Sequence, residues 1–302
     1  MRYDEVYQKG VQKLKDGGIA EAKLEAAIFL EEVCHTSRSD LYAHPEREVS
    51  EEEYNNYVNY LKIRLTRKPL QAIIGKQNFM GMEFYVNPST LIPRQDTEFL
   101  VECVLEELHD GMHILDLCTG SGCILISLMR YSNHCGGVGT DISEEALTAA
   151  VENAERLLQK DPENGQFDDV AVSLEEALKP TTEDSVQFLC TDLFTDLPDK
   201  EKFDIIVSNP PYIATAEIAK LEPEVKDYDP IAALDGGESG LDFYERIIDE
   251  AGNHLVKGGW IYFEIGYDQG EAVKEMLIAK GFCDVEVRKD YAGRDRVALG
   301  RY

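Results

Sequence analysis

The 302-residue sequence lacks the hallmarks of several large protein classes. No stretch reaches the roughly 18 continuous apolar residues that cross a bilayer, and the charged N-terminus has no apolar core of a signal peptide. The seven cysteines include no CxxC pair and their number is odd, which favours reduced thiols over a disulfide framework. These absences predict a soluble, cytoplasmic protein.

Several cofactor fingerprints are also missing. No Gly-Lys-Ser/Thr follows a glycine loop, as a P-loop requires, and the full GxGxxG spacing of dinucleotide folds is absent. The six histidines show no ligand spacing such as HxxxH, so we expect no metal. No haem or flavin motif is present either.

Basic residues are scarce, with 30 Lys and Arg against 58 Asp and Glu and a net charge of −28. Such an acidic surface repels phosphate backbones, which disfavours non-specific binding to nucleic acid. It favours a basic protein partner or a cationic small molecule. Acidity for solubility or adaptation to salt explains the charge equally well.

The length fits two domains, and the first 74 residues are expected to be helical. Residues 20–30 contain strong helix formers, and Ser50 to Glu53 has the pattern of a capping box that opens a second helix. Within the first of these helices, Leu24, Ala27, Ile28 and Glu31 stand at helix spacing. The stripe of the second helix is expected to form a core, although it could also hold a protein partner; it consists of Tyr54, Tyr57, Val58, Leu61 and Leu65.

Further along, residues 75–90 predict a β-hairpin linker with its turn at Gly81. From residue 112 the pattern alternates strands and helices, which is typical of an α/β, doubly wound parallel sheet. The expected strands are 113–117, 137–141, 186–191, 203–208, 260–265, 283–288 and 296–300, the last two as an antiparallel edge pair. Residues 161–184 are predicted to be a surface insertion with a short helix at 174–178.

A glycine-containing loop follows the first of these strands. Gly120 and Gly122 allow a close approach of the backbone to a ligand, and the amides of the following helix suit an anion. Asp141 ends the next strand, where a carboxylate can accept hydrogen bonds from both hydroxyls of a ribose. A helix cap is the other interpretation of this Asp, although Ser143 is available for that role.

The tetrapeptide Asn209-Pro210-Pro211-Tyr212 follows a buried strand. Its prolines fix the backbone, its amide can donate and accept hydrogen bonds, and its aromatic ring offers a flat face, which suits a planar NH2-bearing group. Asp192 and Leu193 come after the third strand. There Asp192 would accept a hydrogen bond from the amine of an adenine, and Leu193 would cover the face of the ring. Together these motifs indicate N-methylation dependent on S-adenosyl-L-methionine.

On these motifs the chain resembles the bacterial peptide chain release factor N5-glutamine methyltransferases, the PrmC/HemK family. The resemblance runs from about residue 75 to 302 and includes Leu91 to Arg94, Asp116 to Cys123, Asp141 to Ser143, Ser208 to Ile213, Leu234 to Gly237, Gly240 to Asp242 and Glu264 to Gly266. It implies a Rossmann-like class I methyltransferase fold with a seven-stranded, mostly parallel sheet. The implied domains are a helical partner-binding domain (1–74), a hairpin linker (75–90) and a catalytic domain (91–302).

The resemblance also implies the reaction and its residues. A methyl group would pass from S-adenosyl-L-methionine to the side-chain nitrogen of the glutamine in the Gly-Gly-Gln motif of release factors, modulating translation termination and leaving S-adenosyl-L-homocysteine. The implied cofactor residues are Cys118, Thr119, Gly120, Ser121, Gly122, Asp141, Ile142, Asp192, Leu193 and Asn209. The implied substrate residues are Asn209, Pro210, Pro211 and Tyr212, with Asn209, Pro210 and Tyr212 catalytic. Cys118 departs from the glycine usual in the family.

Partners and alternatives follow from the same comparison. We expect a release factor as the partner, no direct contact with nucleic acid or membrane, and a monomer. A methyltransferase for N6 of adenine or N2 of guanine shares the tetrapeptide but needs a basic track, which the sequence lacks. A non-catalytic protein that keeps the fold as a cofactor-binding scaffold is the second alternative.

Three nearby residues have more ordinary interpretations. Arg94 either lines the cofactor pocket or forms a salt bridge with Asp96 or Glu98. Glu264 is interpreted as a buried acid with a structural partner, and Cys123 as a packing residue rather than a nucleophile.

Overall fold

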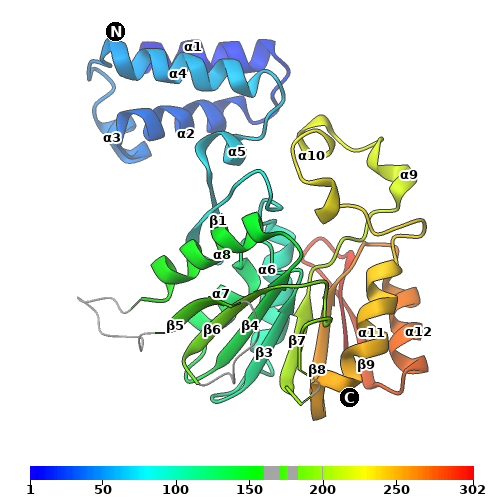
Figure 1. Ribbon diagram of the computed structural model, residues 1–302. Helices are drawn as coiled ribbons and strands as arrows, with labels where there is room; N and C mark the ends of the chain where they lie inside the picture. The colour runs from blue at the N-terminus through cyan, green and yellow to red at the C-terminus, as the bar shows by residue number, and fades with distance from the viewer. Residues whose placement is uncertain (160–169, 176–182, 199) are drawn as a thin grey trace. The chain divides into compact units, whose positions relative to one another are not determined.

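The computed structural model describes residues 1–159, 170–175, 183–198 and 200–302. These residues form two compact units, one of Met1–Lys76 with Glu222–Tyr228 and the other of Gln77–Leu221 with Asp229–Tyr302 (Figure 1). Among the described residues, no helix is long and apolar enough to cross a membrane.

The smaller unit is helical, as expected for residues 1–74. Its helices are α1 (Tyr3–Asp16), α2 (Ala22–Cys34), α3 (Arg38–Ala43), α4 (Glu51–Arg64) and α5 (Leu70–Ile74). The predicted capping box opens α4, because the Ser50 hydroxyl accepts from the Glu53 amide and the Glu53 carboxylate accepts from the Ser50 amide. That prediction is confirmed.

The four residues at helix spacing do not together form the buried face of α2, although Ala27 among them is buried. Leu24 is 41% exposed, whereas Ala26, Phe29 and Leu30 are fully buried. The reason is that α2 packs against both α1 and α4, so its buried face is broad and centred on Phe29. Sequence periodicity alone did not indicate two packing partners.

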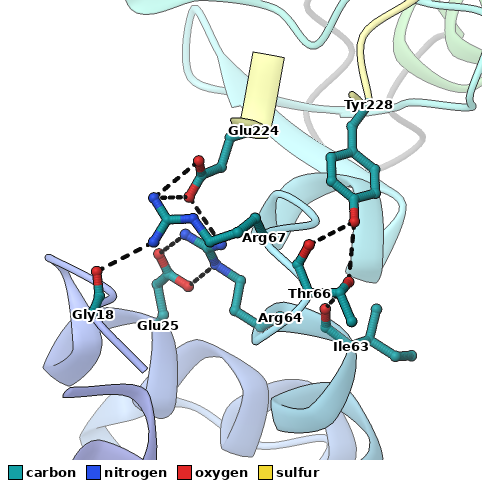
Figure 2. Close-up of polar contacts among 8 residues, drawn as sticks. All are labelled: Gly18, Glu25, Ile63, Arg64, Thr66, Arg67, Glu224 and Tyr228. Atoms are coloured by element: carbon teal, nitrogen blue, oxygen red, sulfur yellow. Dashed lines mark hydrogen bonds and ion pairs between the residues drawn. The ribbon is translucent and has the colours of Figure 1, made fainter. Parts of the chain in front are cut away.

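A short segment distant in sequence completes the smaller unit. It contains α10 (Pro223–Lys226), and the Glu224 carboxylate accepts from Arg64 at 3.2 Å and from Arg67 at 2.8 to 3.0 Å (Figure 2). Arg64 is buried and also binds Glu25 through two nitrogens, at 2.6 and 3.1 Å. At the end of the segment, the Tyr228 hydroxyl donates to the Thr66 carbonyl at 2.8 Å. No motif or spacing in the sequence predicts this attachment.

The predicted hairpin is present. Strands β1 (Lys76–Phe79) and β2 (Met82–Tyr85) pair in a two-stranded sheet. The two turn residues, Met80 and Gly81, both have positive φ, 48° and 71°, as a tight two-residue hairpin turn of the primed type requires.

The larger unit contains a sheet in the order β5-β6-β4-β3-β7-β8-β10-β9. Its strands are β3 (His113–Leu117), β4 (Gly136–Asp141), β5 (Ala171–Glu175), β6 (Ser185–Cys190), β7 (Phe203–Ser208), β8 (Leu255–Glu264), β9 (Cys283–Lys289) and β10 (Asp295–Arg301). Only β10 runs antiparallel to its neighbours in this sheet of described residues, which confirms the mostly parallel fold and the antiparallel edge pair.

The sheet has one strand more than the seven that the sequence predicts. Leu174 and Glu175 lie in β5, which pairs in parallel with β6 from Ala171–Ser185 to Glu175–Leu189, so the helix predicted there is wrong for these two residues. Residues 176–178 lie outside the described part of the chain. Backbone pairing to β6 overrides the local helix propensity, which is a weak preference.

Helices cover both faces of the sheet (Figure 1). One face carries α6 (Gln95–Leu105), α7 (Cys123–Arg130) and α8 (Glu144–Leu157), and the other carries α11 (Asp242–His254) and α12 (Gly270–Ala279). Alternate residues of β3 feed the two cores, with Ile114 in one and Leu115 in the other. The chain passes from β3 towards β4 and β6, then returns to β7 on the other side of β3. That reversal creates the crevice where such sheets bind ligands.

Candidate active site

A cavity of about 440 Å³ lies at the carboxyl ends of β3, β4, β6 and β7. This volume is in the range of small-molecule sites. Its lining includes the predicted residues Cys118, Thr119, Gly120, Ser121, Asp141, Ile142, Asp192, Leu193, Asn209 and Pro211. Gly122, Pro210 and Tyr212 are adjacent in sequence but are not part of the lining. The structure therefore gathers motifs from four strands around one cavity.

The loop after β3 depends on positive φ angles. Gly122 has φ 77°, and a Cβ there would lie 2.8 Å from Ile126 Cδ1 and 3.2 Å from Ala150 Cβ, so only glycine fits. Gly120 has φ 56°, but a Cβ there would meet no atom within 4 Å. The space above Gly120 leaves its backbone open to a ligand.

Two thiols close to this loop are held neutral. Cys118 has a positive φ of 60°, and burial raises the pKa of its thiol. Burial likewise raises the pKa of Cys123 to about 12. Because the thiolate is the nucleophilic form, this supports packing rather than nucleophilic attack for Cys123.

Asp141 ties the glycine loop to the end of β4. Its Oδ2 accepts from the Gly120 amide at 2.9 Å, and its Oδ1 accepts from the Ser143 amide at 3.0 Å. Ser143 caps α8 through the Ala146 amide at 3.1 Å, so the capping role belongs to Ser143. Each carboxylate oxygen has a second lone pair, so Asp141 can still accept hydrogen bonds from a ligand.

The walls near Asp141 suit a nucleoside. Ile142 is 67% exposed at the cavity, and Leu193 borders it from the loop after β6. The carboxylate, the apolar side chains and the open backbone of Gly120 together fit a ribose and an adenine ring. The cavity therefore suits an adenine nucleoside on chemical grounds.

Asp116 anchors the glycine loop through hydrogen bonds, and nothing in the sequence assigned it this role. Its Oδ2 accepts from the Thr119 hydroxyl at 2.6 Å and from the Leu125 amide at 3.3 Å. Among the described residues, Oδ1 has no hydrogen-bond partner. Burial raises the pKa of Asp116 to about 7, because ionisation of the carboxyl group is unfavourable in this buried position.

Asp192 has a partner that the sequence did not reveal. Its Oδ2 accepts from Arg246 Nη2 at 2.8 Å, and both side chains are roughly half exposed and border the cavity. Arg246 lies in α11, far along the chain, and no motif marks it. Pairing between distant elements is not visible in sequence spacing.

The two polar side chains of the tetrapeptide are both anchored. Asn209 Nδ2 donates to Thr97 Oγ1 at 3.3 Å, which leaves Oδ1 as the atom that can accept from a ligand. The Tyr212 hydroxyl donates to Glu264 Oε1 at 3.3 Å, and burial raises the pKa of Tyr212, so it stays protonated. The tetrapeptide thus presents an oriented amide beside a neutral aromatic side chain.

The glycines of the motif from Leu234 to Gly237 explain how the tetrapeptide is held. The Ile213 amide donates to the Leu234 carbonyl at 3.0 Å, and the Gly236 amide donates back to the Ile213 carbonyl at 2.9 Å. A Cβ at Gly236 would lie 2.8 Å from the Pro211 carbonyl oxygen, so the two backbones approach too closely for any side chain.

Gln269 is a further support that sequence reasoning missed. Its Nε2 donates to the Tyr212 carbonyl at 2.9 Å and to the Gly240 carbonyl at 3.1 Å. Its Oε1 accepts from the Gly266 amide at 2.9 Å. A glutamine at the start of a helix carries no functional pattern, so only the fold identifies it.

The structure decides between the interpretations given above for Arg94 and tests the one given for Glu264. Arg94 lines the cavity and pairs with buried Asp229, so the predicted salt bridge to Asp96 or Glu98 is wrong. Asp96 pairs instead with Arg296, and Glu98 accepts from the Met80 amide. Glu264 is buried beside Tyr212 and 4.0 Å from Arg296, which confirms the interpretation as a buried acid with structural partners.

Comparison with known proteins covers nearly the whole chain. Residues 5–75 match a family described as the PrmC N-terminal domain, and residues 108–234 match a methyltransferase domain. The chain is 39% identical over 288 residues to the release factor glutamine methyltransferase of Geobacter sulfurreducens, covering 95% of this chain and 92% of that protein.

Two further similarities agree with this. The release factor glutamine methyltransferase of Clostridium acetobutylicum is 39% identical over 277 residues, covering 91% of this chain and 90% of that protein. Among solved structures, the hMettl16 catalytic domain in complex with the MAT2A 3'UTR hairpin 6 has a TM-score of 0.51. At 18% identity, covering 81% of each chain, it shows a shared fold alone.

Proposed function

This chain belongs to the family of release factor glutamine methyltransferases, and we propose that its cavity holds S-adenosyl-L-methionine beside a glutamine side chain of a release factor. The product is the N5-methylated glutamine of the Gly-Gly-Gln motif. The observation that carries this proposal is the oriented amide of Asn209, which borders the same cavity as Gly120 and Asp141.

The cofactor supplies an electrophilic methyl group on a sulfonium. Asp141 would accept from the ribose hydroxyls, while Ile142 and Leu193 would enclose the adenine and Asp192 would accept from its amine. Residues Cys118 to Gly122 form the backbone turn that approaches the cofactor. The cavity lining and the hydrogen bond from Gly120 to Asp141 support these roles for every residue except Gly122, which lies outside the lining.

The substrate nitrogen needs positioning, because its lone pair is delocalised into the amide carbonyl. Asn209 Oδ1 and the Pro210 carbonyl each accept one N–H of the glutamine amide. With Tyr212 and Pro211 packed around the amide, the nitrogen is held in line with the methyl group. Catalysis then rests on positioning and electrostatics rather than on a strong base.

The helical unit is proposed to bind the release factor, as its match to the PrmC N-terminal domain suggests. We expect the enzyme to act as a cytoplasmic monomer without a nucleic-acid component. Its net charge of −28 agrees with a protein substrate rather than a phosphate backbone.

A methyl-transfer assay tests the proposal. The enzyme is incubated with radiolabelled S-adenosyl-L-methionine and, separately, a release factor, tRNA, ribosomal RNA or DNA. Label is expected in the release factor alone. Transfer to a nucleic acid instead would support an adenine or guanine methyltransferase. Cofactor binding without transfer to any acceptor would support a scaffold.

A further inference from the structure

We propose that Thr97 is a positioning residue that fixes the amide of Asn209 with its oxygen towards the substrate. The proposal rests on the function proposed above and adds a residue that none of the recognised motifs contains. Thr97 lies near the start of α6, more than a hundred residues before Asn209, and the fold alone brings them together.

The two ends of an asparagine amide have the same shape and opposite chemistry. With Oδ1 towards the substrate, Asn209 accepts an N–H of the glutamine; with Nδ2 there, two N–H groups would face each other. Nothing in the shape of the cavity distinguishes these orientations. A specific hydrogen bond must do so.

Thr97 provides that bond. Its Oγ1 accepts from Asn209 Nδ2 at 3.3 Å, and Thr97 is only 2% exposed, so water does not compete readily for the contact. A flipped amide would place Oδ1 against the Thr97 hydroxyl and present a donor to the substrate. Thr97 could accommodate that arrangement only by turning its own proton towards Asn209.

Glu264 disfavours this reorientation of the Thr97 hydroxyl proton. Burial raises the pKa of Glu264, whereas interaction with the Thr97 hydroxyl lowers it, as does the charge of Arg296. Glu264 also accepts from Tyr212 and is itself 1% exposed. A buried carboxylate that interacts with the Thr97 hydroxyl favours a Thr97 proton directed away from Asn209, which leaves the Thr97 lone pair for the Nδ2 contact at 3.3 Å.

Thr97, Asn209 and Glu264 form a cluster, and the charged groups around it are paired with one another. Arg296, 4.0 Å from Glu264, also binds Asp96 at 2.9 Å and Asp290 at 3.2 Å. These ion pairs hold Arg296, and with it the charge next to Glu264, in a defined position. The cluster acts through Asn209, because Thr97 is assigned no contact with the reacting atoms.

Substitution of the hydroxyl tests the proposal. Thr97→Val keeps the shape but removes the acceptor, and it is expected to lower kcat at least about tenfold. Thr97→Ser keeps the hydroxyl and is expected to stay within about threefold of the wild type. The affinity for S-adenosyl-L-homocysteine, measured by calorimetry, should stay within about threefold in both variants, because the cofactor residues are unchanged.

Thr140→Val is the matched control. Thr140 is a fully buried threonine of β4 that borders the cavity, and its hydroxyl has no hydrogen-bond partner among the described residues. The same change there is expected to leave kcat within about twofold. If Thr97→Val folds poorly, Thr97→Ala removes the hydroxyl without adding bulk and must show the same loss of kcat.

Three results would overturn the proposal. These are a kcat of Thr97→Val close to that of the wild type, a loss of cofactor affinity as large as the loss of kcat, or a defect in Thr97→Ser equal to that in Thr97→Val. If the wild type itself does not methylate the release factor, the proposed function fails instead, so the two failures are distinguishable.

Discussion

Gly122 and Gly120 stand two residues apart in the loop after β3, and the structure gives them different reasons to be glycine. Both have positive φ, but only at Gly122 would a Cβ collide with packed side chains, 2.8 Å from Ile126 Cδ1. Gly120→Ala is expected to cost about 1 kcal/mol of stability from backbone strain alone. Gly122→Ala should cost about 2 to 4 kcal/mol, since overpacking adds to the strain.

Urea unfolding of both variants without cofactor measures these costs, and Gly120→Ala is the matched control. Equal destabilisation of the two variants would contradict the packing argument. The comparison separates the conformational role of the loop from its contact with a ligand.

Asp116 predicts a pH dependence of stability. Burial raises its pKa to about 7, so the folded protein holds a proton on Asp116 more tightly than the unfolded chain does. The contribution of Asp116 to stability is therefore fully present below about pH 4 and is lost as pH rises towards 7. Asp116→Asn does not titrate, so its stability relative to the wild type should rise over this range, by up to about 1.4 kcal/mol per pH unit.

Urea unfolding of the wild type and Asp116→Asn between pH 4 and 8 measures this difference. If the asparagine amide destabilises the fold, it does so by the same free energy at every pH, so the change of the stability difference with pH is unaffected. A difference in stability that is flat with pH would show that Asp116 is ionised in the folded protein.

At the scale of elements, the segment Glu222–Tyr228 is fastened to the helical unit by charge. Burial raises the pKa of Glu224, but its backbone hydrogen bond and the neighbouring Arg64 and Arg67 outweigh this, so the pKa is lowered overall. Glu224→Gln should weaken the attachment by about 1 to 3 kcal/mol, since the pair is only partly exposed. Hydrogen exchange should then rise in residues 222–228.

Glu217→Gln is the control for this change. Glu217 and Lys220 form an exposed pair, with side chains 55% and 68% exposed, so little change in exchange is expected. Equal exchange in the wild type and Glu224→Gln would show that the ion pairs do not hold the segment. The same contribution of Glu224 is present above about pH 4.5 and lost as pH falls through its lowered pKa.

The sequence predicted those elements whose cause is local. Strand β7 is a run of β-branched residues before two prolines, the α4 cap is a three-residue reciprocal contact, and the hairpin turns at a glycine. The edge strand β5 escaped prediction because its partner, β6, decides its conformation. The attachment of residues 222–228 escaped for the same reason, since Arg64 and Glu224 are distant in sequence.

The candidate site divides in the same way. Gly120 and Asn209 follow strands and Asp141 ends one, so topology alone places them at one edge of the sheet. Thr97 and Arg246 reach the site through helix packing, which leaves no spacing rule to read. The motif residues are thus predictable, while the side chains that orient them require the fold.

At the level of the whole molecule, the two compact units differ in the roles proposed for them. The larger unit contains the cavity and all the residues proposed for chemistry, whereas the smaller unit matches the PrmC N-terminal domain. A protein substrate that docks on one unit and reacts on the other requires both. The segment Glu222–Tyr228 belongs to the smaller unit, although the chain on each side of it belongs to the larger.

Asn209 is proposed to hold a release factor glutamine for methylation. Peptide mass spectrometry of a release factor, after incubation with S-adenosyl-L-methionine and either the wild type or Asn209→Ala, tests this role most directly. The wild type should add one methyl group to the glutamine of the Gly-Gly-Gln motif. Asn209→Ala should add none, while its cofactor affinity stays within several-fold, roughly 1 kcal/mol. An unmodified glutamine with the wild type, or near-normal turnover with Asn209→Ala, would contradict the account.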